Sequence, residues 1–170
     1  MFYVWLCMSV FGGIVLELAF GFEGLIVPVF ASCSFYFLVL CGWRLSFPFL
    51  AVCGSLLDLA FGRHFPVQLF VLAALVPMSS GWRRHGDCVH WVLQAIPGFL
   101  VGLVSGSLTL LLVRFPGAVL DWGFVWRNVW LLFQFSIGGG LCFPVVSCVL
   151  DRLALRFDFP RYGSVQKVLG

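Results

Sequence analysis

Charged residues are scarce in this sequence. Asp, Glu, Lys and Arg together account for only 10% of the 170 residues, whereas 62% are hydrophobic. Soluble domains carry roughly a quarter charged residues, and a soluble fold of this length has too little interior to bury so many apolar side chains. The scarcity of charge excludes an ordinary soluble domain and predicts an integral membrane protein. The net charge of +3 is small and its basic residues are scattered, so we expect no nucleic-acid partner.

The sequence also lacks the residue patterns of metal, disulfide and catalytic sites. Its seven cysteines lie in or beside apolar runs, without a CxxC pair or a His-rich neighbour, which is typical of small buried hydrophobic side chains. HExxH and GxSxG motifs, a Walker loop and paired intramembrane carboxylates on one helix are all missing. We therefore expect no catalytic residue, no metal and no cofactor, and interpret the chain as a non-enzymatic protein.

What the sequence does contain is a series of long apolar runs. The runs are continuous instead of alternating with period two, which favours membrane-spanning helices of roughly 20 residues over a lipid-exposed barrel. The expected helices cover about residues 2–20, 24–42, 45–61, 66–81, 88–113 and 128–150. The sequence thus predicts an all-α polytopic membrane protein, with about six transmembrane helices in one bundle over residues 1–150. The third and fourth helices are short and closely joined, so a re-entrant pair is the alternative.

The basic residues indicate the orientation of such a bundle. Cytoplasmic loops of membrane proteins carry an excess of Lys and Arg. With six spans, one side of the membrane holds Arg44, Arg83, Arg84, Arg152, Arg156, Arg161 and Lys167, and the other side holds Arg63, Arg114 and Arg127. This bias predicts that both termini lie in the cytoplasm.

The carboxyl-terminal residues 151–170 form an expected cytoplasmic tail that mixes basic and aromatic side chains. Such a segment is typical of a chain lying along the headgroups, because each basic residue near anionic lipid contributes on the order of 1 kcal/mol. The alternative is a disordered end. Membrane lipids are therefore among the expected partners.

Two acidic residues, Glu17 and Asp58, lie inside apolar runs, where ionisable side chains are costly and indicate function by default. Glu17 is within one turn of the expected end of its helix, so its carboxylate is also placed to reach the headgroups. Asp58 precedes the turn at Arg63 and His64, and a carboxylate capped by that turn is the alternative to a chemical role. We interpret Asp58 as a packing or orienting residue.

Glycines accompany Asp58 on one expected helix face. Gly54, Asp58 and Gly62 are spaced i, i+4 and i+8, and glycines at this spacing let a second backbone approach closely. A buried carboxylate needs a partner. The nearest candidates in the sequence are His64, Gln68 and the backbone at Gly62.

A second glycine face lies in the fifth expected helix, where Gly98, Gly102 and Gly106 form a GxxxGxxxG ladder. Such ladders indicate close contacts between helices, within one chain or between chains. The sixth helix contains three glycines at 138–140 and then Pro144, which predicts a kink or a locally open helix. We interpret this feature as a packing dent, with a hinge or a binding notch as the alternatives.

The stretch Gly-x-x-Leu-Asp-x-x-x-Gly resembles a stretch of the rod shape-determining protein MreD family. Its residues here are Gly54, Leu57, Asp58 and Gly62. The surroundings are similar too, with Pro28 in an earlier segment, a short basic loop after the fourth helix and Pro144 in the last helix. The likeness covers nearly the whole chain as architecture, but only nine residues as a motif. The chain departs from the family in lacking a basic amino terminus and in carrying His64 and Pro66 after the motif.

The resemblance implies a non-enzymatic function in the bacterial inner (cytoplasmic) membrane. The protein would belong to the cell-elongation (rod-shape) complex, which guides lateral peptidoglycan synthesis during cell wall biogenesis. Its implied partners are an MreC-like protein, the MreB filament, RodA and the transpeptidase that works with RodA. The resemblance also implies a fold similar to the substrate-binding subunit of ECF transporters.

That fold similarity supplies the alternative function, a small-ligand-binding membrane subunit of an ECF-type vitamin transporter. Such a subunit needs a polar or aromatic pocket near the outer surface and a docking face of small residues on the first helix. Gly12 and Gly13 are candidates for that face, but the chain has few polar residues to recognise a vitamin. An unrecognised membrane enzyme is a third alternative.

Overall fold

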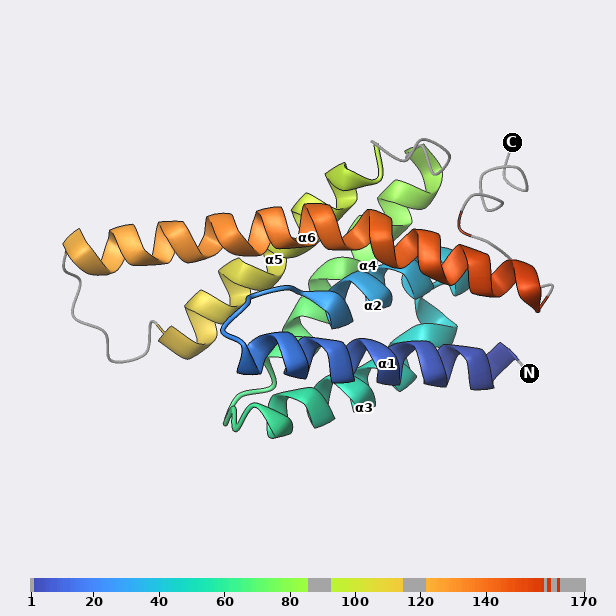
Figure 1. Cartoon of the computed structure of the whole chain (residues 1–170), viewed down its shortest axis with the longest axis horizontal. Helices are drawn as coiled ribbons and strands as arrows, with labels where there is room; N and C mark the ends of the chain where they lie inside the picture. Colours follow the sequence, from blue (N-terminus) through green and yellow to red (C-terminus); the bar gives the residue numbers. More distant parts are fainter. Residues whose placement is uncertain (1, 86–92, 115–121, 158, 160–161, 163–170) are drawn as a thin grey trace.

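The computed structural model describes residues 2–85, 93–114, 122–157, 159 and 162. The elements are α1 (Phe2–Phe22), α2 (Val29–Cys41), α3 (Trp43–Ala60), α4 (Val67–His85), α5 (Ala95–Thr109), the π-helical turn η1 (Leu110–Arg114) and α6 (Trp122–Arg156). They pack side by side in a bundle (Figure 1). Over these residues the chain forms no strand, and the all-α class expected from the sequence is confirmed.

The ends of several helices differ from their expected positions. α2 begins at Val29 instead of near residue 24, because Gly24 adopts a left-handed φ of 75° and Pro28 directly precedes the first helical residue. α6 begins at Trp122 and ends at Arg156, so it includes residues expected in the preceding loop and in the polar tail. The expected start of the fifth helix, at residues 88–92, lies outside the described residues.

Four helices are long and apolar enough to cross a membrane. They are Tyr3–Phe22 in α1, Trp43–Ala60 in α3, Ala95–Arg114 in α5 with η1, and Trp122–Arg156 in α6. α2 is apolar but has only 13 residues, which gives a length of about 20 Å against a hydrocarbon core of about 30 Å. The structure is thus that of an α-helical membrane protein, and the count of six crossings stays a prediction.

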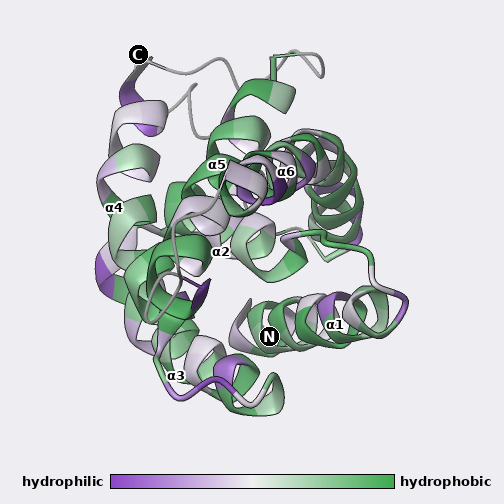
Figure 2. Cartoon of the chain, turned by 90° about the vertical axis from the view of Figure 1, so that its left-hand side faces the viewer, coloured by the Kyte–Doolittle hydropathy of each residue, from purple (hydrophilic) through white to green (hydrophobic). Residues whose placement is uncertain are grey.

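α2 occupies the centre of the bundle and contacts each of the other five α-helices (Figure 2). Every residue from Val29 to Leu40 is buried, with Phe30, Phe35 and Phe37 fully so. A helix surrounded on all sides is expected to be apolar on all sides, as this one is. The position of α2 therefore determines how the remaining helices are arranged.

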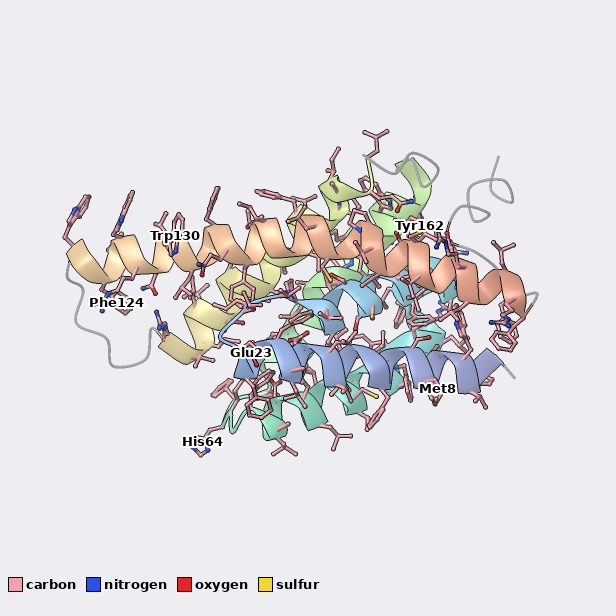
Figure 3. The ribbon with its side chains drawn as sticks, viewed as in Figure 1. Met8, Glu23, His64, Phe124, Trp130 and Tyr162 are labelled. Atoms are coloured by element: carbon pink, nitrogen blue, oxygen red, sulfur yellow. The ribbon has the colours of Figure 1, made fainter. Side chains whose placement is uncertain are left out.

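The outer surface of the bundle is formed largely by big apolar side chains. On α1, Met8 is exposed (Figure 3). Phe11 of the same helix, Leu59 of α3 and Leu141 of α6 are exposed as well. Soluble monomers rarely expose so many large apolar side chains together. Such a surface suits contact with lipid chains, since the helices satisfy their own backbone groups.

The helices are linked at two opposite ends of the bundle. The α1–α2 and α3–α4 links lie at the same end as the first turns of α6, while the amino terminus lies at the other end (Figure 1). Glu23 and His64 mark the first of these ends in Figure 3. We call it the loop end, and it contains the candidate site.

α6 is longer than a membrane crossing requires. Its 35 residues span about 52 Å at 1.5 Å per residue, and its first turns extend past the rest of the bundle (Figure 1). On these turns Trp122, Trp126 and Trp130 are exposed at i, i+4 and i+8. Tryptophan is enriched where a helix meets the headgroups, so we expect this stripe to mark the membrane boundary at the loop end.

Asp151, Ala154 and Tyr162, beyond position 150, pack against the bundle. The carboxylate Oδ1 of Asp151 accepts hydrogen bonds from the Tyr36 hydroxyl at 2.6 Å and from the backbone N–H of Tyr162 at 3.0 Å. The Tyr162 side chain is fully buried and its ring stacks on that of Tyr36, with centroids 5.5 Å apart. Asp151 and Tyr162 thus differ from the surface-lying or disordered tail expected from the sequence, whereas residues 158, 160–161 and 163–170 lie outside the described residues.

Candidate functional site

Asp58 joins the end of α3 to the start of α4. Its carboxylate Oδ2 accepts a hydrogen bond of 2.8 Å from the backbone N–H of Gln68, the second residue of α4. Its Oδ1 forms an ion pair of 3.1 Å with the Arg63 guanidinium. The first N–H groups of a helix have no partner within that helix, and a negative charge near them is favourable. Asp58 therefore caps α4 from a neighbouring helix.

The other residues of the motif support this joint in different ways. A Cβ atom at Gly54 would lie 3.0 Å from Cβ of Gln68 and 3.3 Å from the Phe30 ring, so glycine lets α3 approach both α4 and α2. Leu57 is fully buried in the core. Gly62 has a φ of 63°, which only glycine adopts readily.

The expectation that Gly62 shares a helix face with Gly54 and Asp58 is wrong. α3 ends at Ala60, and the backbone N–H of Arg63 bonds the carbonyl of Asp58 at 2.9 Å, as in a glycine-terminated helix end. A Cβ atom at Gly62 would meet nothing within 4 Å. Gly62 therefore serves to end the helix and not to admit a neighbour.

Among the expected partners of Asp58, Gln68 is the one that the structure brings to the carboxylate, and it does so through its backbone. His64 is exposed at the loop end (Figure 3). Arg63, which the sequence placed in the adjoining turn, supplies the second partner. A carboxylate with two engaged oxygens, 3% exposed as a residue, is placed to hold two helices together.

Glu17 makes the equivalent contact between α1 and α2. Its Oε2 accepts a hydrogen bond of 2.6 Å from the backbone N–H of Phe30, the second residue of α2. The residue before α2 is Pro28, which provides no side-chain cap of its own. The interpretation that Glu17 reaches the headgroups differs from this arrangement, since its carboxylate points to the start of the central helix.

The glycine ladder of α5 lies against α6. A Cβ atom at Gly98 would lie 2.6 Å from Cβ of Phe143, and one at Gly106 would lie 2.9 Å from Cβ of Phe135. At Gly102 the nearest atoms belong to the backbone carbonyl of Phe135, closer than real Cβ contacts allow. The ladder therefore marks a close contact between two helices of one chain.

Pro144 lies inside α6, facing the bundle. It is buried, and α6 continues through it and through the glycines at 138–140 without interruption, so the expected locally open helix is not found. Because proline has no N–H, the hydrogen-bond ladder of the helix lacks one bond here. Close by, the single hydrogen of the Ser147 hydroxyl has two acceptors within reach, Gln94 Oε1 at 2.5 Å and the Pro144 carbonyl at 3.0 Å.

A cavity of about 250 Å³ lies at the loop end, beside the contacts that Glu17 and Asp58 make. Its apolar walls include the α1–α2 link, Phe61, Leu131 and Phe135. Its polar and charged lining comes from separate elements and comprises Glu17, Arg63, Gln68, Ser105, Thr109 and Arg114. In the following we call it the loop-end cavity.

The sequence did not predict Ser105, Thr109 or Arg114 as site residues. Ser105 and Thr109 are spaced i and i+4 in a largely apolar helix whose other polar residue is Ser107. This spacing puts both on one face and was a usable signal. Nothing in the sequence placed Arg114, at the end of η1, near Glu17 or Gln68. Only the fold brings them to one cavity.

The polar residues around the cavity offer hydrogen bonds and charge. Within the described ranges, no three or more His, Cys, Asp or Glu residues are grouped to hold a metal ion, and the cysteines there, Cys7, Cys33, Cys41, Cys53, Cys142 and Cys148, are free thiols. The carboxylates of Glu17 and Asp58 hold neighbouring helices together, and the polar lining of the cavity can contact a small polar group. In comparisons with known proteins, no family model, no curated protein and no solved structure matches this chain.

Proposed function

We propose that the protein is a non-enzymatic membrane component of the bacterial cell-elongation complex, acting with an MreC-like protein, MreB, RodA and its transpeptidase in lateral peptidoglycan synthesis. The observation that carries this proposal is the position of the Gly54–Asp58–Gly62 stretch, the part of the chain that resembles the MreD family. It forms the joint between α3 and α4, where Asp58 engages Gln68 and Arg63. A motif used to fix helix positions fits a protein that acts by presenting a shaped surface to partners.

The arrangement of the bundle agrees with such a role. Most of the described chain consists of long, apolar helices that expose large apolar side chains. In a membrane these surfaces can contact the transmembrane helices of partners. With both termini in the cytoplasm, the loop end and the projecting start of α6 lie on the outer side. Peptidoglycan is assembled on that side of the membrane.

The test is complementation combined with co-isolation. The protein is expressed with an affinity tag in a rod-shaped bacterium that lacks its own MreD protein and has become round. We expect the rods to return and an MreC-like protein to be isolated with the tagged chain from solubilised membranes. A membrane-inserted chain that restores no rods and isolates none of the four partners would contradict the proposal.

A further inference from the structure

Two buried polar atoms of residues that line the loop-end cavity have no hydrogen-bond partner among the described residues. They are the side-chain oxygen of Gln68, a residue that is 5% exposed, and the hydroxyl of Ser105, a residue that is 4% exposed. Buried polar groups in native proteins are nearly always paired, and an unpaired one is destabilising. The cavity beside them is where a partner for both can be accommodated.

One side of the cavity is rich in hydrogen-bond acceptors. The side-chain oxygen of Gln68 can only accept a hydrogen bond, and Gln68 is one of the residues that line the cavity. Glu17 lines the same cavity, and its carboxylate accepts the backbone N–H of Phe30. The Phe30 ring and Cβ of Gln68 both lie close to Gly54. A group that donates hydrogen bonds and carries positive charge suits this side.

The other side of the cavity is basic. Arg114 is exposed at the rim, and its guanidinium donates to the Asn128 side-chain oxygen at 3.3 Å. It forms no ion pair with a carboxylate of the described residues, whereas Arg63 is engaged by Asp58. Ser105 and Thr109 line the cavity on the helix that leads to Arg114. An anionic group suits this side, since arginine binds phosphate and carboxylate through paired N–H groups.

The size of the cavity limits its occupant. Sites for drug-sized ligands measure roughly 300–1,000 Å³, and this cavity is about 250 Å³. The apolar walls formed by Phe61, Leu131 and Phe135 do not add hydrogen bonds. A compact group with its two charges a few bonds apart fits the space and the lining.

We propose that the loop-end cavity binds a compact zwitterion, with its ammonium group against Gln68 and Glu17 and its phosphate or carboxylate against Arg114. The same chemistry occurs in the headgroup of phosphatidylethanolamine and in small free solutes such as phosphoethanolamine. The site does not depend on the proposed role in cell elongation. The polar groups of this site come together only in the folded chain, and the sequence alone did not indicate them.

The test measures ligand-dependent stabilisation of the full chain in phosphatidylcholine nanodiscs. We expect saturating phosphoethanolamine to raise the melting temperature by about 5 °C or more if a free solute is bound. If the occupant is a lipid headgroup, nanodiscs containing phosphatidylethanolamine give this rise and the solute does not. Phosphocholine has no N–H to donate to Gln68, and ethanolamine has no anion for Arg114, so both should stabilise far less.

Variants distinguish the site from a general effect on the protein. Gln68→Met keeps the backbone bond to Asp58 but removes the acceptor, and Arg114→Gln removes the charge at the rim. Each should weaken binding of the stabilising species about tenfold. The matched controls Gln134→Met and Arg127→Gln change exposed residues of α6 outside the cavity and should bind as the wild type does. Stabilisation by neither ethanolamine species, or equal losses in the controls, would overturn the inference.

Discussion

The carboxylate of Asp58 accepts the backbone N–H of Gln68 at 2.8 Å, and Glu17 accepts that of Phe30 at 2.6 Å in the same relation. In both cases an acid near the end of one helix caps the second residue of the next helix. Both caps follow a proline, Pro28 or Pro66, that precedes the first helical residue. Two costly intramembrane acids thus have the same structural use at the loop end.

The contact between α5 and α6 depends on the absence of a side chain at Gly102. We expect Gly102→Ala to lower the free energy of unfolding by about 2–3 kcal/mol, because its Cβ would overlap the Phe135 backbone and force the helices apart. The melting temperature in detergent should fall by about 5–10 °C. The matched control is Gly12→Ala in α1, where a Cβ meets nothing within 4 Å and the change should be neutral or slightly stabilising. Equal effects of the two substitutions would count against the close contact.

Asp151 holds the carboxyl-terminal segment to the bundle. Asp151→Ala removes the acceptor for both the Tyr36 hydroxyl and the Tyr162 N–H, so the segment should open more often. We expect trypsin to cleave the variant several times faster than the wild type at Arg161 and Lys167. Asp151→Asn keeps an acceptor oxygen and should be cleaved at a rate near that of the wild type. Identical cleavage of all three proteins would show that these bonds do not restrain the segment.

The orientation of the bundle can be mapped with reporters that are active only in the cytoplasm. Because basic residues are biased to one side, fusions after Gly86 and after Gly170 should be active. Fusions in the α3–α4 link near His64 should be silent, since this link lies at the loop end, opposite the amino terminus (Figure 1). Fusions within residues 115–121 should be silent too, because the six-crossing arrangement puts them on the side with fewer basic residues. An inactive fusion at the carboxyl terminus would exclude the arrangement with six crossings.

Apolar runs predicted the helical class and the approximate place of each helix, but not which helix is central. Hydropathy gives α1 and α2 similar signals, although α1 exposes Phe11 to the outside and α2 exposes no residue between Val29 and Leu40. Lipid and protein interior are both apolar, so a single sequence cannot distinguish them. The sequence misplaced helix ends that depend on local backbone geometry. One example is the start of α2 at Val29, which follows the left-handed φ of Gly24.

For the candidate site, the sequence identified the costly residues but only part of their surroundings. Asp58 and Gln68 were paired as candidates, because they lie within ten positions of one another. The Glu17–Phe30 bond was not foreseen, since Phe30 has no polar side chain that would suggest it as a partner of Glu17. The loop-end cavity was out of reach, because Ser105 and Arg114 come to Glu17 only through packing of α5 and η1 against the other helices.

The central claim is that Asp58 acts by holding α3 and α4 together, in a protein that we propose takes part in determining cell shape. Asp58→Asn keeps an oxygen for the Gln68 N–H and should lower the free energy of unfolding by about 1 kcal/mol, whereas Asp58→Leu leaves Gln68 and Arg63 without their partner and should lower it by about 3 kcal/mol. The control Glu23→Gln, at an exposed acid of the same end, should have no effect.

The deciding measurement combines the melting temperature of the Asp58→Asn protein in detergent with the shape of cells that depend on it. The account predicts a fall of about 2–4 °C relative to the wild type together with full recovery of rod-shaped cells. A variant that melts within this range but leaves the cells round would contradict the account, because the charge of Asp58 would then be needed for function itself.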